Sequence, residues 1–198
     1  MQKRQSSAAR GTERVDANKV AAMASNIVLI TGAARSGKSH YAEQQARELG
    51  PRRLYIATAE AKDQEMCQRI DEHKRRRGND WVTIEEPLAL AETLLAQRAQ
   101  TDCALVDCLT LWLSNLLLAY EAQYAQAKVE QFVEATRQLD FHLMLVSNEV
   151  GWGIVPDNSL ARQFRDLSGW ANQRMAAVAN EVVLMVTGIP MIVKKTTL

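Results

Sequence analysis

Short apolar runs alternate with longer amphipathic stretches from Asn26 to the end of the chain. The apolar runs predict strands at 27–31, 53–57, 82–84, 104–106, 143–146, 182–186 and 191–193. Helical spacing predicts helices from Lys38, over 63–76 and 88–99, up to Leu118, over 125–139 and after the candidate N-caps Asp157 and Asn158. Because the strands are almost continuously apolar, we expect both faces to be buried. This pattern is typical of an α/β protein with a mainly parallel sheet between layers of helices.

A phosphate-binding motif lies between the first predicted strand and the first predicted helix. The residues Gly32-Ala33-Ala34-Arg35-Ser36-Gly37-Lys38-Ser39 match G-x-x-x-x-G-K-[ST]. The glycines let backbone N–H groups turn toward an anion, and the helix N-terminus adds partial positive charge. Lys38 is expected to reach the β- and γ-phosphates, and Ser39 to help hold Mg²⁺. The alternative is a plain glycine-rich turn, which this strand–loop–helix context disfavours. The motif predicts a nucleoside triphosphate but does not define the reaction.

Carboxylates follow two further strands, at the edge where ligands bind in parallel sheets. Asp107 ends an apolar run and resembles the Walker-B carboxylate, which holds the metal directly or through water; the alternative is a cap of the next helix. Glu149 follows the strand at 143–146 and is either a second metal-side or base carboxylate or an acceptor that shapes the loop. Thr58, Ala59 and Glu60 follow the second strand.

Three histidines occur in the chain, and they differ in context. His40 follows the phosphate motif and is interpreted as a surface or packing residue, and His142 begins a buried strand and is interpreted as structural. His73 precedes four consecutive cations, Lys74, Arg75, Arg76 and Arg77. Such a charge run can be a solvated helix face. It can also keep an imidazole neutral and nucleophilic while binding the phosphates that it attacks. Composition alone leaves both interpretations open.

Length and composition restrict the number of domains, the binding partners and the compartment that we expect. The 198 residues suit one domain, and a net charge of +1 gives no global field that would favour nucleic acid or an anionic membrane. The three cysteines lack metal-ligand spacing, and we interpret Cys103 and Cys108 as buried packing residues in a reducing, cytoplasmic compartment. Residues 1–25 are expected to form a flexible extension without a signal peptide, and 26–198 a single domain. The apolar stretch from Cys103 to Tyr120 contains Asp107, so we do not expect a membrane span.

Several segments, in this order, resemble one enzyme family. They are GAARSGKS (32–39), LYIATAE (54–60), EMCQRIDEHKRRR (65–77), WVTIE (81–85), SNEVGWGIVP (147–156) and NSLARQFRDLSGWANQ (158–173). The chain resembles the bifunctional adenosylcobinamide kinase/adenosylcobinamide-phosphate guanylyltransferase family of cobalamin biosynthesis from about Asn26 to Lys194. The phosphate motif alone is shared by many families, whereas the NEVGxGIVP block and the histidine segment are far more specific.

The resemblance implies two reactions at one nucleotide site. The first phosphorylates the aminopropanol hydroxyl of adenosylcobinamide with ATP or GTP. In the second, His73 takes GMP from GTP, releasing pyrophosphate, and passes it to the cobinamide phosphate. The resemblance also implies a RecA-like P-loop NTPase fold in three layers, and a homo-oligomer, commonly a trimer. The implied nucleotide contacts are Gly32 to Ser39, Thr58, Ala59, Glu60, Lys74, Arg75, Arg76, Arg77, Glu85 and Asp107, with Mg²⁺ at Ser39 and Asp107.

The chain departs from the family pattern at three positions. Ala33 replaces a common glycine, which is costly only if φ is positive there. Glu72 stands where some members have a second histidine, and Trp170 replaces a basic residue. Two other functions stay open at this point: a simple P-loop kinase in which His73 is inert, and a non-catalytic nucleotide switch.

Overall fold

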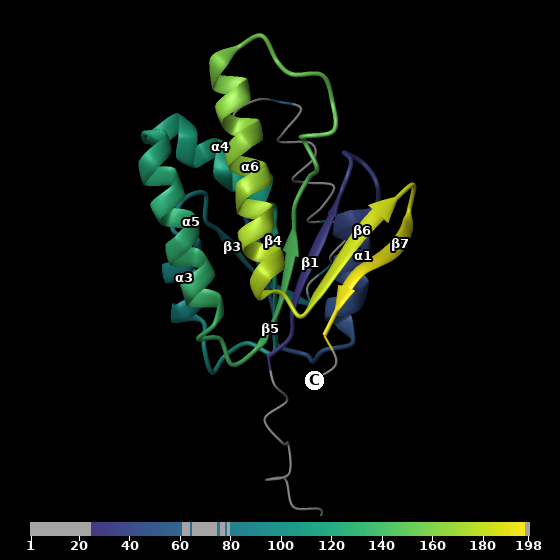
Figure 1. The fold of residues 1–198 in the computed structure, drawn as a ribbon. Coiled ribbons are helices and arrows are strands. Elements are labelled where there is room, and N and C mark those ends of the chain that lie inside the picture. Colours follow the sequence, from purple (N-terminus) through teal and green to yellow (C-terminus); the bar gives the residue numbers. More distant parts are fainter. Residues whose placement is uncertain (1–24, 61–63, 65–74, 76–77, 79, 197–198) are drawn as a thin grey trace, which may run out of the picture.

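Seven strands form one sheet through the centre of the protein (Figure 1). The computed structural model describes residues 25–60, 64, 75, 78 and 80–196. The strands are β1 (Ile27–Gly32), β2 (Arg53–Ala57), β3 (Trp81–Glu85), β4 (Cys103–Asp107), β5 (His142–Val146), β6 (Glu181–Val186) and β7 (Ile189–Lys195). All seven predicted strands are therefore present, several of them longer by one or two residues at an end.

The sheet has the order β3-β2-β4-β5-β1-β6-β7, and of its six described strand pairs the β6–β7 pair alone is antiparallel. A two-residue turn, Thr187-Gly188, joins these two strands with φ of 49° and 86°. Positive φ at both central residues is what a tight hairpin requires, and glycine adopts it without strain. The other neighbouring strands are parallel, which confirms the predicted mainly parallel sheet.

Five described helices cover the two faces of the sheet. They are α1 (Lys38–Arg47), α3 (Leu90–Ala96), α4 (Leu109–Ala119), α5 (Ala122–Thr136) and α6 (Ser159–Val178). Most of the helix predicted over 63–76 lies outside the described residues, although Gln64 and Arg75 are helical. Asn158 is the N-cap of α6, as predicted, and its side chain accepts from the backbone N–H of Leu160 and Ala161.

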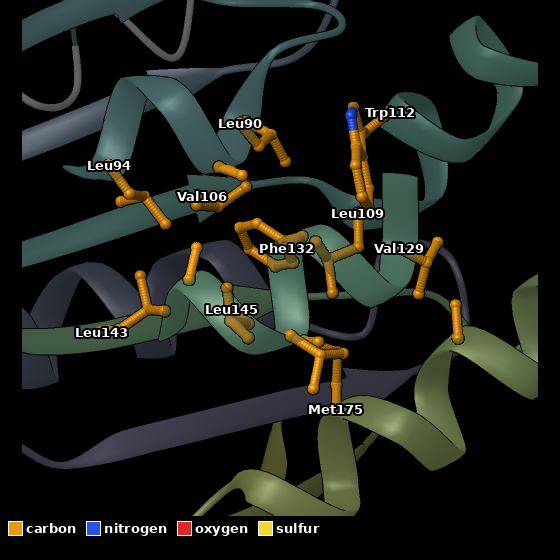
Figure 2. Close-up of a cluster of buried hydrophobic side chains, with 14 of the residues drawn as sticks. Leu90, Leu94, Val106, Leu109, Trp112, Val129, Phe132, Leu143, Leu145 and Met175 are labelled. Atoms are coloured by element: carbon orange, nitrogen blue, oxygen red, sulfur yellow. The ribbon is translucent and has the colours of Figure 1, made fainter. Parts of the chain in front are cut away.

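Side chains that alternate along the strands divide the core into two clusters. One cluster lies under α3, α4, α5 and α6, and the other lies under α1. Figure 2 shows the first, in which Trp112 of α4 contacts Phe132 of α5 with ring centroids 5.2 Å apart. With helices on both faces of the sheet, the three-layer α/β architecture expected from the sequence is confirmed.

The last strand departs from the expected burial on both faces. Ile189, Met191, Ile192 and Val193 of β7 are more than half exposed. Among the described residues the strand pairs on one side only, with β6, and it lies at the edge of the sheet (Figure 1). Pro190 fits this position, because an edge strand tolerates the loss of a backbone donor. The predicted extension at 1–25 lies outside the described residues except for Ser25, and the single domain at 26–198 stays a prediction.

Candidate nucleotide site

Strand register brings the candidate residues to one edge of the sheet. Glu85 is level with Ala57, Ala57 with Asp107, and Asp107 with Val146, which is in turn level with Ile30 just before the phosphate motif. Thr58 directly follows β2, and Glu149 is the third residue after the end of β5. Because all of these strands are parallel, their carboxyl ends meet at one edge, where α/β sheets bind ligands.

The phosphate motif forms a tight loop between β1 and α1. Gly32 has φ of 143°, and a Cβ there would lie 2.5 Å from the carbonyl oxygen of Met185 on β6. Gly37, the N-cap of α1, has φ of 93°, and Arg35 has φ of 58°. Ala33 is not among the described residues with positive φ, so alanine brings no backbone strain at this departure from the family pattern. The loop is thus shaped by Gly32 and Gly37.

Lys38, the first residue of α1, turns its side chain back over the loop. Its Nζ donates to the carbonyl oxygen of Ala33 at 2.6 Å and lies 3.5 Å from Oγ of Ser36. Burial lowers the pKa of Lys38, whereas Cys108, Asp107 and Glu149 act in the opposite direction. The ammonium group is therefore held among acceptors at the place where a phosphate chain would lie.

Asp107 is held by a neighbouring strand. The hydroxyl of Tyr55 on β2 donates to Oδ2 of Asp107 at 2.8 Å, and Tyr55 is buried. The N-cap of α4 is Cys108, so the alternative interpretation of Asp107 as the cap of this helix is wrong. The carboxylate instead lies half-buried at the end of β4, as a Walker-B residue would.

Thr58 supports the site from behind. Its hydroxyl accepts from the backbone N–H of Cys108 and donates to the carbonyl oxygen of Cys108, both at 2.8 Å. Nδ2 of Asn115 on α4 donates to the carbonyl oxygen of Thr58 at 2.8 Å. Thr58 is fully buried, so its side chain joins the ends of β2 and β4, and its predicted nucleotide contact stays a prediction.

Glu149 connects three elements at the edge of the sheet. Its Oε1 accepts from Thr31 Oγ1 at 2.5 Å and from Asn172 Nδ2 at 3.4 Å. Oδ1 of Asn172 on α6 accepts from the hydroxyl of Ser147 at 2.7 Å. These bonds support the interpretation of Glu149 as a loop-shaping acceptor, and a metal-side or base role stays a prediction.

The other predicted contacts divide into two groups. Glu60 and Glu85 are exposed near the carboxyl ends of β2 and β3, Ala59 is half-buried, and Arg75 is exposed and helical. The predicted nucleophile His73 lies outside the described residues, together with Lys74, Arg76 and Arg77. The structure therefore brings the phosphate loop, Asp107 and the strand ends together at one edge of the sheet.

The remaining histidines and cysteines have structural surroundings. His40 is exposed, and Nδ1 of the half-buried His142 accepts from the backbone N–H of Asn26 at 3.2 Å. Cys103 and Cys108 are free and buried, as predicted. Both histidine interpretations are thus confirmed.

The oxygen donors at the site suit Mg²⁺. Ser39 supplies a hydroxyl and Asp107 a carboxylate, the kinds of ligand that Mg²⁺ takes. Within the described part of the chain, no group of three or more His, Cys, Asp or Glu side chains is placed to hold a metal. Mg²⁺ in nucleotide enzymes needs only one or two protein ligands beside phosphate and water, so the two donors are sufficient.

Sequence analysis missed the residues that orient these groups. Tyr55 and Thr31 were assigned only to strands, and Asn172 only to a helix. Each is polar within a largely buried element, and buried polar groups need partners. That rule could have marked them, but it could not have named Asp107 or Glu149 as the partners, because those contacts join distant parts of the chain.

A glycine-containing phosphate-binding loop follows the first strand, and a carboxylate ends a nearby parallel strand. These two features define a P-loop nucleotide-binding protein. The fold agrees with a solved structure, the flagellar accessory protein FlaH from Methanocaldococcus jannaschii. That likeness has a TM-score of 0.50 at 12% identity and covers 86% of this chain and 79% of that one. No helix in the described ranges is long and apolar enough to cross a bilayer.

Sequence comparisons give the family. The family model described as cobinamide kinase/cobinamide phosphate guanyltransferase matches residues 28–193, and the chain belongs to this family. A bifunctional adenosylcobalamin biosynthesis protein CobP from Pseudomonas aeruginosa is 48% identical over 84% of this chain and 96% of its own. The CobU proteins of the same description from Escherichia coli and Salmonella typhimurium are 38% and 41% identical, each over 85% of this chain and 99% of its own. The protein is therefore an enzyme of cobalamin biosynthesis with kinase and guanylyltransferase activities, which excludes the non-catalytic switch.

Proposed function

We propose that one nucleotide site carries out both reactions and that His73 carries the GMP between them. ATP or GTP first phosphorylates the aminopropanol hydroxyl of adenosylcobinamide. GTP then reacts with His73, and the guanylylated histidine gives its GMP to adenosylcobinamide phosphate. The products are adenosylcobinamide-GDP and pyrophosphate.

The observation that carries this proposal is the alignment of the strand ends with the phosphate loop. Lys38 lies over the loop, and both Lys38 and Thr31 are buried. Phosphoryl transfer depends on positioning and on neutralising the charge that develops on the phosphate oxygens. Lys38 provides such a charge within the described residues, and Lys74, Arg75, Arg76 and Arg77 are expected to add others. Mg²⁺, held by Ser39 and Asp107, would neutralise phosphate charge.

Each of the two steps of the GMP transfer forms one bond to the α-phosphorus and breaks another. A ring nitrogen of His73 forms a bond to the α-phosphorus of GTP while the bond to the pyrophosphate oxygen breaks. A phosphate oxygen of the cobinamide substrate then attacks the same phosphorus, and the P–N bond breaks to free the imidazole. A protein nucleophile replaces a direct encounter between two anionic substrates with two separate steps. The chain leads from the carboxyl end of β2, at the site edge, into the segment that contains His73.

The exposed strand β7 supports assembly into a homo-oligomer, and the family resemblance favours a trimer. Ile189, Met191, Ile192 and Val193 form an apolar stretch on an edge strand. Such edges are usually covered or paired in soluble assemblies. We place the enzyme in the cytoplasm, where both nucleotides are available.

Labelling with α-³²P-GTP and Mg²⁺ tests the histidine. We expect a protein adduct that is labile in acid and stable in alkali, as a phosphoramidate is, and we expect His73→Ala to abolish it. His40→Ala is the matched control, because His40 is exposed beside the phosphate loop and should leave the adduct unchanged. The role of His73 would be contradicted if both variants kept the label or if both lost it. Kinase activity that persists in His73→Ala would show that the first reaction does not need the histidine.

A further inference from the structure

The segment between β5 and α6 presents apolar side chains to solvent. Trp152 is 74% exposed, Ile154 98% and Val155 58%. A single exposed apolar residue is ordinary, but three within four consecutive positions beyond the carboxyl end of β5 indicate a binding surface. The run from Val150 to Pro156 contains no charged residue, so an anionic nucleotide has no partner on these side chains.

Both ends of this segment are anchored. The backbone N–H of Glu149 donates to the carbonyl oxygen of Gly32 at 3.0 Å, which ties its start to the phosphate loop. At its other end, Nη1 of Arg162 donates to the carbonyl oxygens of Pro156 and Asp157 at 2.9 and 2.6 Å. The exposed apolar residues therefore lie between two fixed points.

The segment extends beyond the carboxyl edge of the sheet, on the same side as the phosphate loop (Figure 1). Trp152 is three residues from Glu149, which limits their separation to about 10 Å in extended chain. A substrate that contacts this segment can therefore also reach the phosphate-binding loop.

We propose that Trp152, Ile154 and Val155 form the contact surface for the corrin ring of the acceptor substrate; this inference rests on the proposed function. The corrin ring is broad and largely flat, bears methyl groups at its edge, and ends one side chain in the hydroxyl that must reach the γ-phosphate. An indole ring can pack against the apolar parts of such a ring system, and aliphatic side chains can pack against its methyl groups. The apolar segment then binds the macrocycle of the acceptor, and the phosphate loop binds the phosphates of the donor.

Two loop variants and one matched control test this contact. Trp152→Ser and the double variant Ile154→Ser/Val155→Ser remove exposed side chains, so the fold should not change. Val82→Ser is the matched control. It makes the same valine-to-serine change as Val155→Ser, but on the edge strand β3, where Val82 is 64% exposed. We expect the loop variants to raise the KM for adenosylcobinamide about tenfold or more, as loss of a buried apolar contact does. The KM for ATP and the yield of the GTP adduct should stay unchanged, and Val82→Ser should behave as the unchanged enzyme.

Equilibrium dialysis with adenosylcobinamide measures binding without turnover. Weaker binding of adenosylcobinamide by the loop variants supports the inference. If the unchanged protein forms no GTP adduct, that failure overturns the proposed function alone and leaves the binding result standing. Unchanged binding and unchanged KM in both loop variants would overturn the inference. A lower sedimentation mass of the loop variants would also overturn it, since the segment would then be a contact between copies of the chain.

Discussion

Oδ2 of Asp107 accepts a 2.8 Å hydrogen bond from the hydroxyl of Tyr55 on the adjacent strand β2. Tyr55 is buried, and its ring packs edge-on against Trp81 with centroids 6.1 Å apart. The tyrosine is thus fixed by the core and in turn fixes one oxygen of the carboxylate. Asp107 therefore has a set orientation before any nucleotide arrives.

Tyr55→Phe is expected to weaken the use of Mg²⁺ more than the binding of nucleotide. Without the hydroxyl, the carboxylate of Asp107 loses a charge-assisted bond, which lowers the free energy of unfolding by about 1–2 kcal/mol. We expect the Mg²⁺ concentration for half-maximal kinase rate to rise several-fold, measured by titration at saturating ATP. Tyr41→Phe, on the half-buried Tyr41 of α1, is the control. An unchanged Mg²⁺ dependence in Tyr55→Phe would count against the positioning of Asp107 by this bond.

Lys38→Met is expected to reduce the kinase rate without unfolding the protein. The ammonium group donates to Ala33 within the loop, and we expect its contribution to the reaction to come from the charge it brings to the phosphates. Removing one such stabilising group typically costs about 10²–10³-fold in kcat. Steady-state kinase assays check this value, and circular dichroism checks the fold. A kcat within a factor of a few of the original would exclude Lys38 from the reaction.

Asn172→Ala is expected to destabilise the protein. Ser147 is fully buried and donates to Oδ1 of Asn172, so the change leaves a buried hydroxyl without this acceptor. It also removes a donor to Glu149. We expect a loss of about 1–3 kcal/mol in the free energy of unfolding, measured in urea. Gln173→Ala changes the exposed neighbouring position and should have little effect; equal losses in the two variants would contradict the network.

The buried cysteines should resist alkylation at mildly alkaline pH. Burial raises the pKa of Cys103 from 9.0 to about 12 and that of Cys108 to about 11. Only the thiolate reacts, so iodoacetamide at pH 8.5 should label both slowly in the folded protein and rapidly after denaturation. Peptide mass spectrometry over time measures the two rates. Labelling of either residue at the rate of the denatured chain would show that its thiol is accessible.

The same shifts set the direction of a pH effect on stability. The unfolded chain releases these thiol protons near pH 9, whereas the folded chain keeps them until about pH 11 or 12. Because the unfolded state binds fewer protons in this window, the stability that comes from the neutral buried thiols is present below pH 9 and falls as the pH rises above it. Urea unfolding at pH 8 and pH 10 should show this decrease, and a double Cys103→Ala/Cys108→Ala variant should show less of it.

The strand positions, the phosphate loop and the family could be predicted from the sequence, because they depend on local signals: apolar runs, glycine spacing and motif order. The sequence also placed Asp107 and Glu149 at strand ends. It could not decide whether Asp107 caps the next helix, because that depends on where α4 begins, and the N-cap is Cys108. Nor could it show the bond that holds the carboxylate, because its donor, Tyr55, is 52 positions away along the chain.

Only the tertiary structure joined Glu149 to Thr31 and Asn172, and only the structure showed β7 to be an exposed edge. Both results depend on which strands become neighbours and which face a helix covers, and local periodicity does not specify either. The exposure of Trp152 and Ile154 followed in the same way. From the sequence alone, an apolar residue is expected to lie in the core. The structure shows that no part of the described chain covers these two side chains.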